Sequence, residues 1–318
     1  MGADVSLLGN LNIDMLILGD GPKNWEQIFG FAQVTDVHIT AAGTVGYTSQ
    51  DLAKLGLRAQ VVSAVSDDPF SNFVLDTLNK KGVNCTHVQI EERKEGGIAI
   101  YMLLFGDRKR PAAYRMPTHN PWPMHFSTAQ MDAIMDARLF HSGGYLHFKD
   151  HWHGVVAELY QEAKQRGLIT CMDPQFPLVP YDPPWMRAMD DLLPNIDIFI
   201  CDEIEARNLT QKEDLDEAAM VLMDSGPETV VIKQGAEGST VYQNEFRYHQ
   251  NAIQLGDVVD SIGAGDAYCA GFIFGTLQNW PLEKRAKFAS TAAAFTVLGV
   301  GGTDTFAPLQ KILENMPA

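Results

Sequence analysis

The chain has 318 residues, an apolar content of 46% and a formal net charge of −16. This length is enough for one large α/β domain or two small ones, and the apolar content is ample for a sizeable core. The negative charge argues against a nucleic-acid partner, which needs a basic face, and against electrostatic attachment to anionic lipid.

In chain order, apolar and amphipathic segments alternate over most of the sequence. The strands expected from apolar runs are 5–8, 60–65, 137–141, 168–172, 196–201, 229–233 and 239–242. The helices expected from helical spacing and end signals are 50–55, 69–80, 155–166, 214–224, 267–277 and 284–298. Such alternation predicts a mostly parallel sheet with helices on both faces and ligands at the carboxyl ends of its strands.

Four segments in the N-terminal part do not fit this alternation. They are 11–18, 34–40, 97–105 and 112–116, which look like strands without crossover helices. The first of them carries Asn12 and Asp14 within an apolar stretch, so it is neither a signal peptide nor a membrane span. We therefore expect no membrane partner.

The cysteines indicate a reducing compartment. None are paired at the short spacings of a zinc site or a disulfide framework; they are Cys85, Cys171, Cys201 and Cys269. We expect reduced, mostly buried thiols in a cytoplasmic protein.

The segment 260–268, DSIGAGDAY, is the most informative part of the chain. The turn from Gly263 to Gly265 leads into an apolar helix, whose first backbone N–H groups are unpaired and attract an anion. Asp266 follows at once, and a base beside an anion site suits phosphoryl transfer to a hydroxyl. The helix dipole is expected to keep Asp266 ionised at neutral pH. The alternative is a glycine-rich loop whose aspartate only caps a core helix.

DSIGAGDAY resembles the signature Asp-Thr/Ser-x-Gly-Ala-Gly-Asp-x-Phe of the ribokinase-like (PfkB) family of carbohydrate kinases, from which only Tyr268 departs. The resemblance implies an α/β fold, a three-layer ribokinase-like sandwich forming a single domain over 1–318, with a small β-sheet lid drawn from about 11–41 and 97–117. It implies ATP-dependent phosphorylation of a hydroxyl, expected to be primary, of a sugar or sugar derivative. Lids in this family often pair between subunits, so a homodimer is expected by analogy.

The resemblance assigns the phosphoryl end of the site. It implies that Asp266 takes the proton of the acceptor hydroxyl, while the N–H groups of Gly263, Ala264 and Gly265 hold the developing charge. Lys233, Gly235 and Gly238 are similar to the strand-Gly-x-x-Gly turn that lies beside ATP in the family. A β-hairpin turn would need the same shape.

Two metal sites are implied in the same way. Asp202 and Glu205 resemble the Asn-x-x-Glu motif that organises magnesium and the phosphates through water, with Asp202 in place of the asparagine. The same two residues suit a helix N-cap with an acid in the first turn, and the two roles are compatible. The positions that resemble the family's potassium site are Asp260, Thr296, Gly301 and Thr305.

The acceptor end departs more from the family. Asn12 and Asp14 resemble the segment whose aspartate binds sugar hydroxyls, although a turn aspartate is the alternative. Gly43 and Tyr47 lie where the family has Gly-Gly-x-Gly-x-Asn, so Tyr47 replaces an asparagine that touches sugar. It either stacks on a ring or belongs to the core. Arg115 is similar to an arginine that reaches the substrate in fructokinase-like and ketodeoxygluconate-kinase-like relatives; a solvated loop is the alternative.

Other interpretations stay open. One is a nucleoside kinase of the same family, with Tyr47 stacked on the base, and another is an inactive ligand-sensing protein on this fold. Four histidines lie close in sequence, but no Glu or Cys completes a zinc set with them, so structural or surface roles are expected. They are His141, His147, His151 and His153. The alternative is that His147 or His151 lines the substrate pocket, because Gly143 and Gly144 end a central strand.

Overall fold

The protein is described here from a computed structural model, which covers residues 2–19, 24–29, 34–92, 96–102, 112–115 and 125–317. Its central sheet has nine strands in the order β13-β12-β11-β10-β9-β8-β1-β4-β5. Neighbours from β5 to β11 pair in parallel, and β12 and β13 add an antiparallel edge. The strands are β1 (Ala3–Leu8), β4 (Ala59–Ser66), β5 (Asn84–Glu91), β8 (Ala137–Gly143), β9 (Ile169–Asp173), β10 (Ile198–Asp202), β11 (Thr229–Lys233), β12 (Ser239–Gln243) and β13 (Phe246–Gln250).

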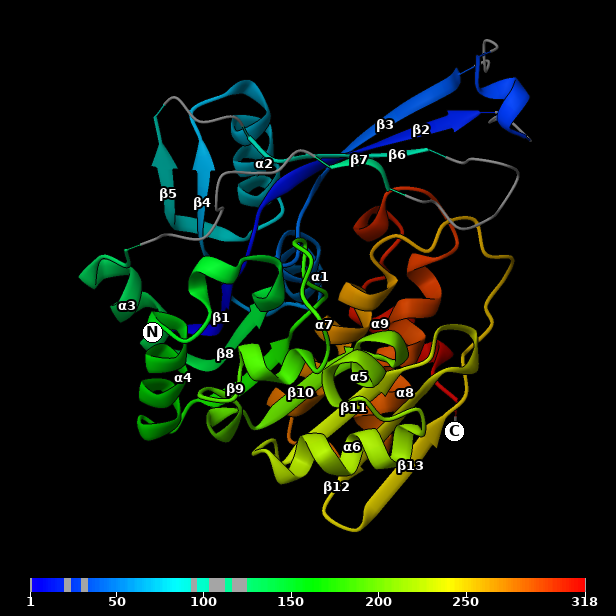
Figure 1. The fold of residues 1–318 in the computed structure, drawn as a ribbon. Helices are drawn as coiled ribbons and strands as arrows, with labels where there is room; N and C mark the ends of the chain where they lie inside the picture. The colour runs from blue at the N-terminus through cyan, green and yellow to red at the C-terminus, as the bar shows by residue number, and fades with distance from the viewer. Residues whose placement is uncertain are drawn as a thin grey trace.

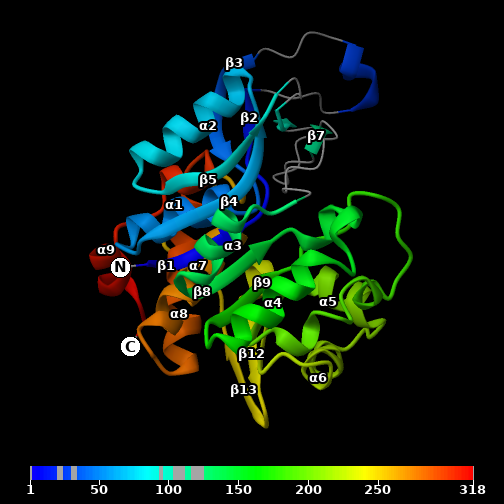
Figure 2. The ribbon, with the colours of Figure 1, turned by 90° about the vertical axis from the view of Figure 1, so that its left-hand side faces the viewer.

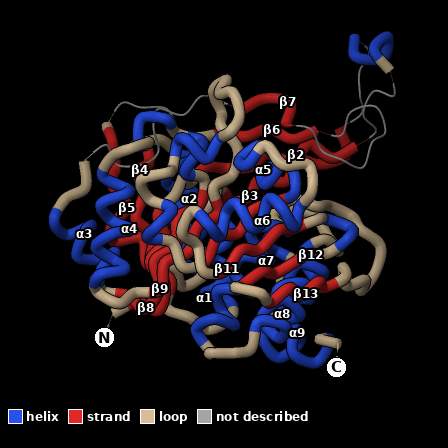
Figure 3. Tube along the Cα trace, turned by 60° about the horizontal axis from the view of Figure 1, so that its bottom comes forward, coloured by secondary structure: helices blue, strands red, loops and turns tan. Residues whose placement is uncertain are grey.

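Helices cover both faces of this sheet and make three layers (Figures 2 and 3). The helices of one face are α3 (Thr128–Met135), α4 (Val155–Gln165), α5 (Glu203–Thr210) and α6 (Leu215–Asp224). Those of the other are α1 (Gly46–Lys54), α2 (Pro69–Lys80), α7 (Ala264–Leu277) and α8 (Leu282–Thr296), with α9 (Leu309–Asn315) packed outside α8. From Ala267 onward α7 is buried on all sides, because it lies between the sheet and α8. Its continuous apolar sequence is what such a position requires.

A second sheet, which we call the small sheet, has the strand order β3-β2-β6-β7. Its strands are β2 (Asn12–Gly19), β3 (Val34–Ala42), β6 (Ile98–Met102) and β7 (Ala112–Arg115). In Figure 1 it lies beyond the ends to which the arrowheads of β4 and β5 point. The small sheet therefore stands at the carboxyl edge of the central sheet, where an α/β fold binds its ligands.

The predicted fold class is confirmed, and α2 and β11 have the predicted bounds. The sequence patterns missed β5, β13, α3 and α9. The strands β5 and β13 lie at the sheet edges, and α9 buries only Ile312, while α3 is a helix of only 8 residues. The helix predicted from Ala267 begins at Ala264. Of the predicted lid, residues 20–23, 30–33, 103–111 and 116–117 lie outside the described part of the chain. Among the helices that the structure describes, none has the length and apolar character needed to cross a bilayer.

Candidate active site

The start of α7 directs backbone N–H groups to the carboxyl edge of the sheet, and of these the Ala264 N–H donates to the Ser261 carbonyl oxygen at 3.3 Å. Gly263 precedes the helix with φ +77°, and a Cβ there would lie 2.9 Å from the Cα of Gly302, so this position requires glycine. The N–H groups of Ala264, Gly265 and Asp266 belong to the first turn, where no helical acceptor exists. A Cβ on Gly265 would lie 3.5 Å from Lys233 Nζ. Gly265 therefore leaves room for an anion between these amides and an ammonium group.

Asp266 is the third residue of α7, and Thr48 Oγ1 donates to its Oδ1 at 3.3 Å. Burial, and next the negative charge of Asp173, raise the pKa of Asp266 to about 7, although Lys233 and Thr48 oppose the shift. The expectation of an aspartate fully ionised at neutral pH therefore needs correction. Desolvation outweighs the helix dipole here, and the carboxyl titrates in the range that suits a general base.

One cavity of about 200 Å³ brings the predicted acceptor residues to Asp266. Its wall comes from the loop between β1 and β2, from β2 and β6 of the small sheet, from the start of α1 and the loop before it, from the loops after β8 and β9, and from the start of α7 with the turn before it. It includes the predicted residues Asn12, Asp14, Gly43, Tyr47, Gly263 and Asp266. Arg115 ends β7 opposite Ala99, a cavity residue, but its side chain is outside the described part of the chain.

Asp14 and Tyr47 form a buried pair in this wall. The Tyr47 hydroxyl donates to Asp14 Oδ2 at 2.8 Å, and Asn12 Nδ2 donates to Asp14 Oδ1 at 2.8 Å. Asp14 is 3% exposed and Tyr47 is 4% exposed. Asp14 lies in β2, not in a turn, and Tyr47 lies in α1 and lines the cavity. Both groups are thus held in place before any ligand binds.

Sequence reasoning missed two polar residues that extend this pair into a network. Asn10 Nδ2 donates to Asn12 Oδ1 at 2.8 Å, and Thr44 Oγ1 lies 2.7 Å from both Asn10 Oδ1 and the Gly143 carbonyl oxygen. The network therefore joins the end of β8 to β2 and α1. The close spacing of Asn10, Asn12 and Asp14 after a buried strand was the signal available in the sequence.

Asp202 and Glu205 form the N-cap of α5. Asp202 Oδ1 accepts from the Glu205 N–H at 2.7 Å, and Glu205 Oε2 accepts from the Asp202 N–H at 2.8 Å. The capping interpretation is therefore realised in full. Glu205 is 5% exposed; burial, and next the charge of Asp173, raise its pKa to about 8. A carboxyl in this state would gain from a nearby cation.

Lys233 ends β11 and pairs with an aspartate that the sequence motifs did not reveal. Its Nζ lies 2.7 Å from Asp173 Oδ2, and the Cys269 thiol donates to the same oxygen at 3.3 Å. Although burial opposes both charges, each partner stabilises the other: Asp173 raises the pKa of Lys233, and Lys233 lowers that of Asp173. The available signal was an aspartate at the end of an apolar parallel strand.

The turn after β11 contains the predicted nucleotide glycines. Gly235 has φ +55° and open space where a Cβ would lie. Gly238 has φ +99°, and a Cβ there would collide with the Gln250 carbonyl oxygen. Gly238 is therefore required by the close approach of the end of β13 to this turn. Gly235, two residues after Lys233, leaves an open surface.

The predicted potassium residues lie where the segment before α7 meets the segment after α8. Asp260 is 2% exposed, and its backbone N–H lies 3.4 Å from the Val297 carbonyl oxygen. Thr305 Oγ1 donates to the Thr296 carbonyl oxygen at 2.7 Å, and Gly301 has φ +97°. The structure therefore brings these two segments together.

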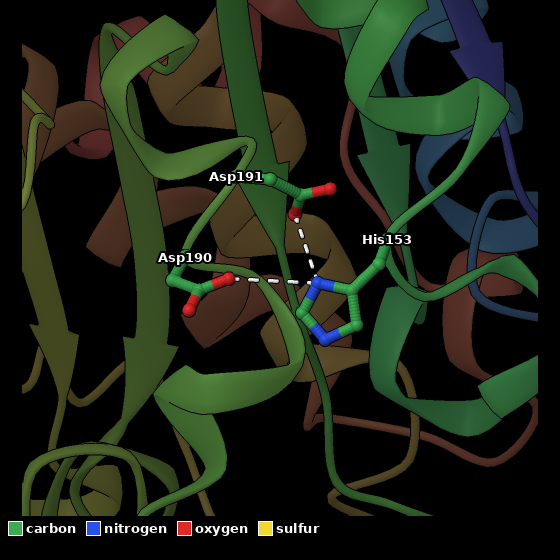
Figure 4. Close-up of side chains that lie close together, drawn as sticks. All are labelled: His153, Asp190 and Asp191. Carbon is green, nitrogen blue, oxygen red and sulfur yellow. Dashed lines mark ion pairs between the residues drawn. The ribbon is translucent and has the colours of Figure 1, made fainter.

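The four histidines go to different places. His141 and His151 are buried, which lowers the pKa of each to about 4, and His147 lines the cavity. His153 Nδ1 lies 3.5 Å from Asp190 Oδ1 and from Asp191 Oδ1 (Figure 4). This exposed trio lies outside the cavity wall.

Comparison with known proteins gives a consistent result. Residues 30–308 match the pfkB family carbohydrate kinase. The chain is 28% identical to the 2-dehydro-3-deoxygluconokinase of Thermoproteus tenax, over 82% of this chain and 80% of that protein. It is 26% identical to the ribokinase of Haemophilus influenzae, over 99% of this chain and 98% of that protein. The Arabidopsis thaliana ribokinase complexed with ribose and ATP superposes with a TM-score of 0.83 at 20% identity, covering 100% of both chains.

Fold and family together define an ATP-dependent carbohydrate kinase. The chain belongs to the pfkB family.

Proposed function

We propose that this kinase transfers the γ-phosphoryl group of ATP to a primary hydroxyl of a monosaccharide-sized sugar or sugar acid. The observation that carries the proposal is the single cavity shared by Asp266 and the Asp14–Tyr47 pair. Its volume of about 200 Å³ is below the range of roughly 300–1,000 Å³ common for larger ligands. A monosaccharide suits this space better than a nucleoside does.

In this proposal Asp266 is the general base. One Asp266 oxygen accepts the proton of the acceptor hydroxyl while the bond from that hydroxyl oxygen to the γ-phosphorus forms. The bond between the γ-phosphorus and the bridging oxygen breaks, and ADP leaves with the electron pair. The N–H groups of Gly263, Ala264 and Gly265 hold the charge on the phosphoryl oxygens.

Asn12, Asp14, Gly43, Tyr47 and Arg115 are proposed to bind the acceptor. Both Asn12 Nδ2 protons have acceptors, Ile13 O and Asp14 Oδ1, and the Tyr47 hydroxyl proton is donated to Asp14. The Asn12 amide and the Tyr47 hydroxyl therefore have no proton to donate to a ligand, and this part of the wall offers the capacity of its oxygen atoms to accept hydrogen bonds. That capacity suits the hydroxyl groups of a sugar.

Lys233, Gly235 and Asp202 are proposed to face the nucleotide, with Gly238 shaping the turn, and Glu205 to hold magnesium through water. The buried Glu205 carboxyl, whose pKa is raised, fits a site completed by a cation. Magnesium supplies charge neutralisation of the phosphates. Potassium is proposed near Asp260, with main-chain and hydroxyl oxygens around Thr296, Gly301 and Thr305.

We further propose that residues 1–318 form one domain in which the small sheet is a lid, and that the lid pairs in a homodimer. Val37 and Ile39 of β3 support this, because both are apolar and about 40% exposed. Light scattering after gel filtration tests it, since Val37→Lys should yield a monomer if the lid is the interface. The free cysteines among the described residues support a cytoplasmic location.

Turnover with magnesium-ATP over a panel of acceptors tests the function. We expect ADP formation with a sugar or sugar acid, and 2-dehydro-3-deoxygluconate and ribose are the first candidates. Adenosine as the sole acceptor would favour the nucleoside kinase. If ATP is not consumed with any compound of the panel, the result would favour the ligand-sensing protein.

Tyr47→Phe is expected to raise KM for the acceptor by about 10- to 100-fold and to leave KM for ATP unchanged. It removes the hydrogen bond to the Asp14 carboxyl group, and hydrogen bonds to charged groups contribute roughly 1.5–3 kcal/mol. Tyr248→Phe is the matched control, since its hydroxyl bonds Gln250 in β13, away from the cavity. Equal KM values in the two variants would contradict the role of Tyr47.

The pH dependence of kcat/KM for the acceptor reports on Asp266. Its raised pKa of about 7 means that the carboxyl gains a proton as the pH falls through 7, and a protonated carboxyl cannot act as base. We expect kcat/KM to fall about tenfold per pH unit below that point and to level off above it. An acid limb centred near 4 would show that Asp266 stays ionised.

A further inference from the structure

Asp173 lies between the acceptor end and the phosphoryl end of the proposed active site, and it belongs to none of the sequence motifs described above. It ends β9 in the middle of the central sheet and is 3% exposed. Its carbonyl oxygen accepts from the Gly144 N–H at 2.9 Å, and Gly143 of β8 lies opposite it in parallel register. The backbone that carries the Asp173 carboxylate is therefore held by the neighbouring strand.

Asp173 Oδ2 is directed to the phosphoryl end of the site. It accepts from Lys233 Nζ at 2.7 Å and from the thiol of Cys269 at 3.3 Å. Cys269 follows Asp266 by three residues, about one turn of α7. Since Lys233 Nζ lies 3.5 Å from the place of a Gly265 Cβ, this oxygen positions the ammonium group beneath the first turn of α7.

Asp173 Oδ1 is directed to the acceptor end. It accepts from the backbone N–H and from the side-chain Nε2 of Gln175, both at 3.3 Å. Gln175 has φ +57°, a backbone conformation that residues with side chains seldom adopt, and it lines the cavity. Two hydrogen bonds to one oxygen thus hold the first turn of the loop after β9.

We propose that Asp173 is a positioning residue that holds the acceptor wall, through Gln175, at a fixed separation from the phosphoryl end, through Lys233. The inference rests on the proposed function. The Asp173 carboxylate accepts from four donors, which occupy the roughly four acceptor positions of a carboxylate and so restrict the movement of this side chain. Transfer requires reacting atoms about 3–3.5 Å apart, and a misplacement of about 1 Å can reduce the rate on the order of 100-fold.

The negative charge of Asp173 also affects two other carboxyl groups of the proposed site. After burial, it is the largest cause of the raised pKa values of Asp266 and Glu205. The competing explanation is a buried ion pair with Lys233 that only affects folding. If the ion pair only affected folding, breaking it would lower the free energy of unfolding. It would not change KM for the acceptor through Gln175 and ATP binding through Lys233 as two separate effects.

Steady-state kinetics of the full chain separate these explanations, with magnesium-ATP and the best acceptor of the panel. We expect Gln175→Ala to raise KM for the acceptor about tenfold with kcat changed less than threefold. Lys233→Met should lower kcat by about 100-fold and weaken binding of a non-hydrolysable ATP analogue, measured by calorimetry. Asp173→Ala should do both. Adding Asp173→Ala to the Gln175→Ala/Lys233→Met variant should change each constant less than threefold, because both routes are already removed.

A matched control is Asp197→Asn, which removes a paired carboxylate at the amino end of β10, where Lys164 Nζ lies 3.1 Å away. It should leave kcat and both KM values within twofold. If Asp173→Ala does not fold, the variant Asp173→Ala/Lys233→Met replaces it, because this variant leaves no unpaired ammonium group. Its KM for the acceptor is expected to be tenfold higher than that of Lys233→Met.

The inference is overturned if KM for the acceptor is the same in Asp173→Ala/Lys233→Met as in Lys233→Met. It is also overturned if Asp173→Ala reduces kcat as much in the Gln175→Ala/Lys233→Met background as in the wild type. An inactive wild-type protein would instead contradict the proposed function, so the two failures are distinguishable.

Discussion

Asp266→Asn is expected to lower kcat by about 10²–10⁴-fold, the range that a positioned general base contributes. The amide keeps the shape of the carboxyl and the contact with Thr48 but cannot accept the acceptor's proton. Nucleotide binding should change less than threefold, because the N–H groups at the start of α7 remain. Single-turnover rates and calorimetry with a non-hydrolysable ATP analogue measure the two quantities.

Asp257→Asn is the matched control for this variant. Asp257 is an exposed aspartate of the segment that precedes the same helix. The control should retain wild-type kcat. If Asp266→Asn kept kcat within tenfold of the wild type, Asp266 would be only a first-turn residue of α7, the alternative raised for its sequence motif.

Gly265→Ala is expected to lower kcat/KM for ATP by about 100-fold without loss of stability. Gly265 is in the first turn of α7 and does not have a positive φ, and in helix interiors alanine is favoured over glycine by up to about 1 kcal/mol. The added methyl would lie 3.5 Å from Lys233 Nζ, an ordinary contact, so the fold tolerates it. It would, however, fill the space between the amides and the ammonium that the phosphoryl group is proposed to enter. The N–H groups remain, but the methyl group would keep the phosphoryl oxygens away from them, and loss of one hydrogen bond of this kind costs about 10²–10³ in rate.

Gly271→Ala in the same helix should show the opposite result. A Cβ there would lie 2.7 Å from the Cα of Ala289, so α7 and α8 would have to separate. Thermal unfolding should reveal lower stability, while KM for ATP of the folded fraction should be retained. If Gly265→Ala behaved in this way, with lost stability and unchanged KM, the first turn of α7 would not be the phosphoryl site.

The sequence alone was sufficient for the features that depend on neighbours in the chain. Alternating apolar strands and amphipathic helices predicted the parallel sheet, because burial of each element depends on its own periodicity. The glycines before α7 predicted a helix start open to an anion, since the missing helical acceptors are a local property. The capping box of Asp202 and Glu205 was readable for the same reason.

The tertiary structure decided which side chains meet. Tyr47 and Asp14 are 33 positions apart, Asp173 and Lys233 are 60 apart, and Asp173 and Cys269 are 96 apart. Their contacts follow from the order β11-β10-β9-β8-β1 and from the placement of α1 and α7 on one face of the sheet. The same assembly withdraws Asp266 from water and sets Asp173 nearby, so its pKa rises where the helix dipole alone predicted an ionised group. Desolvation and charge depend on everything packed around a residue, and that packing exists only once the strands and helices have assembled.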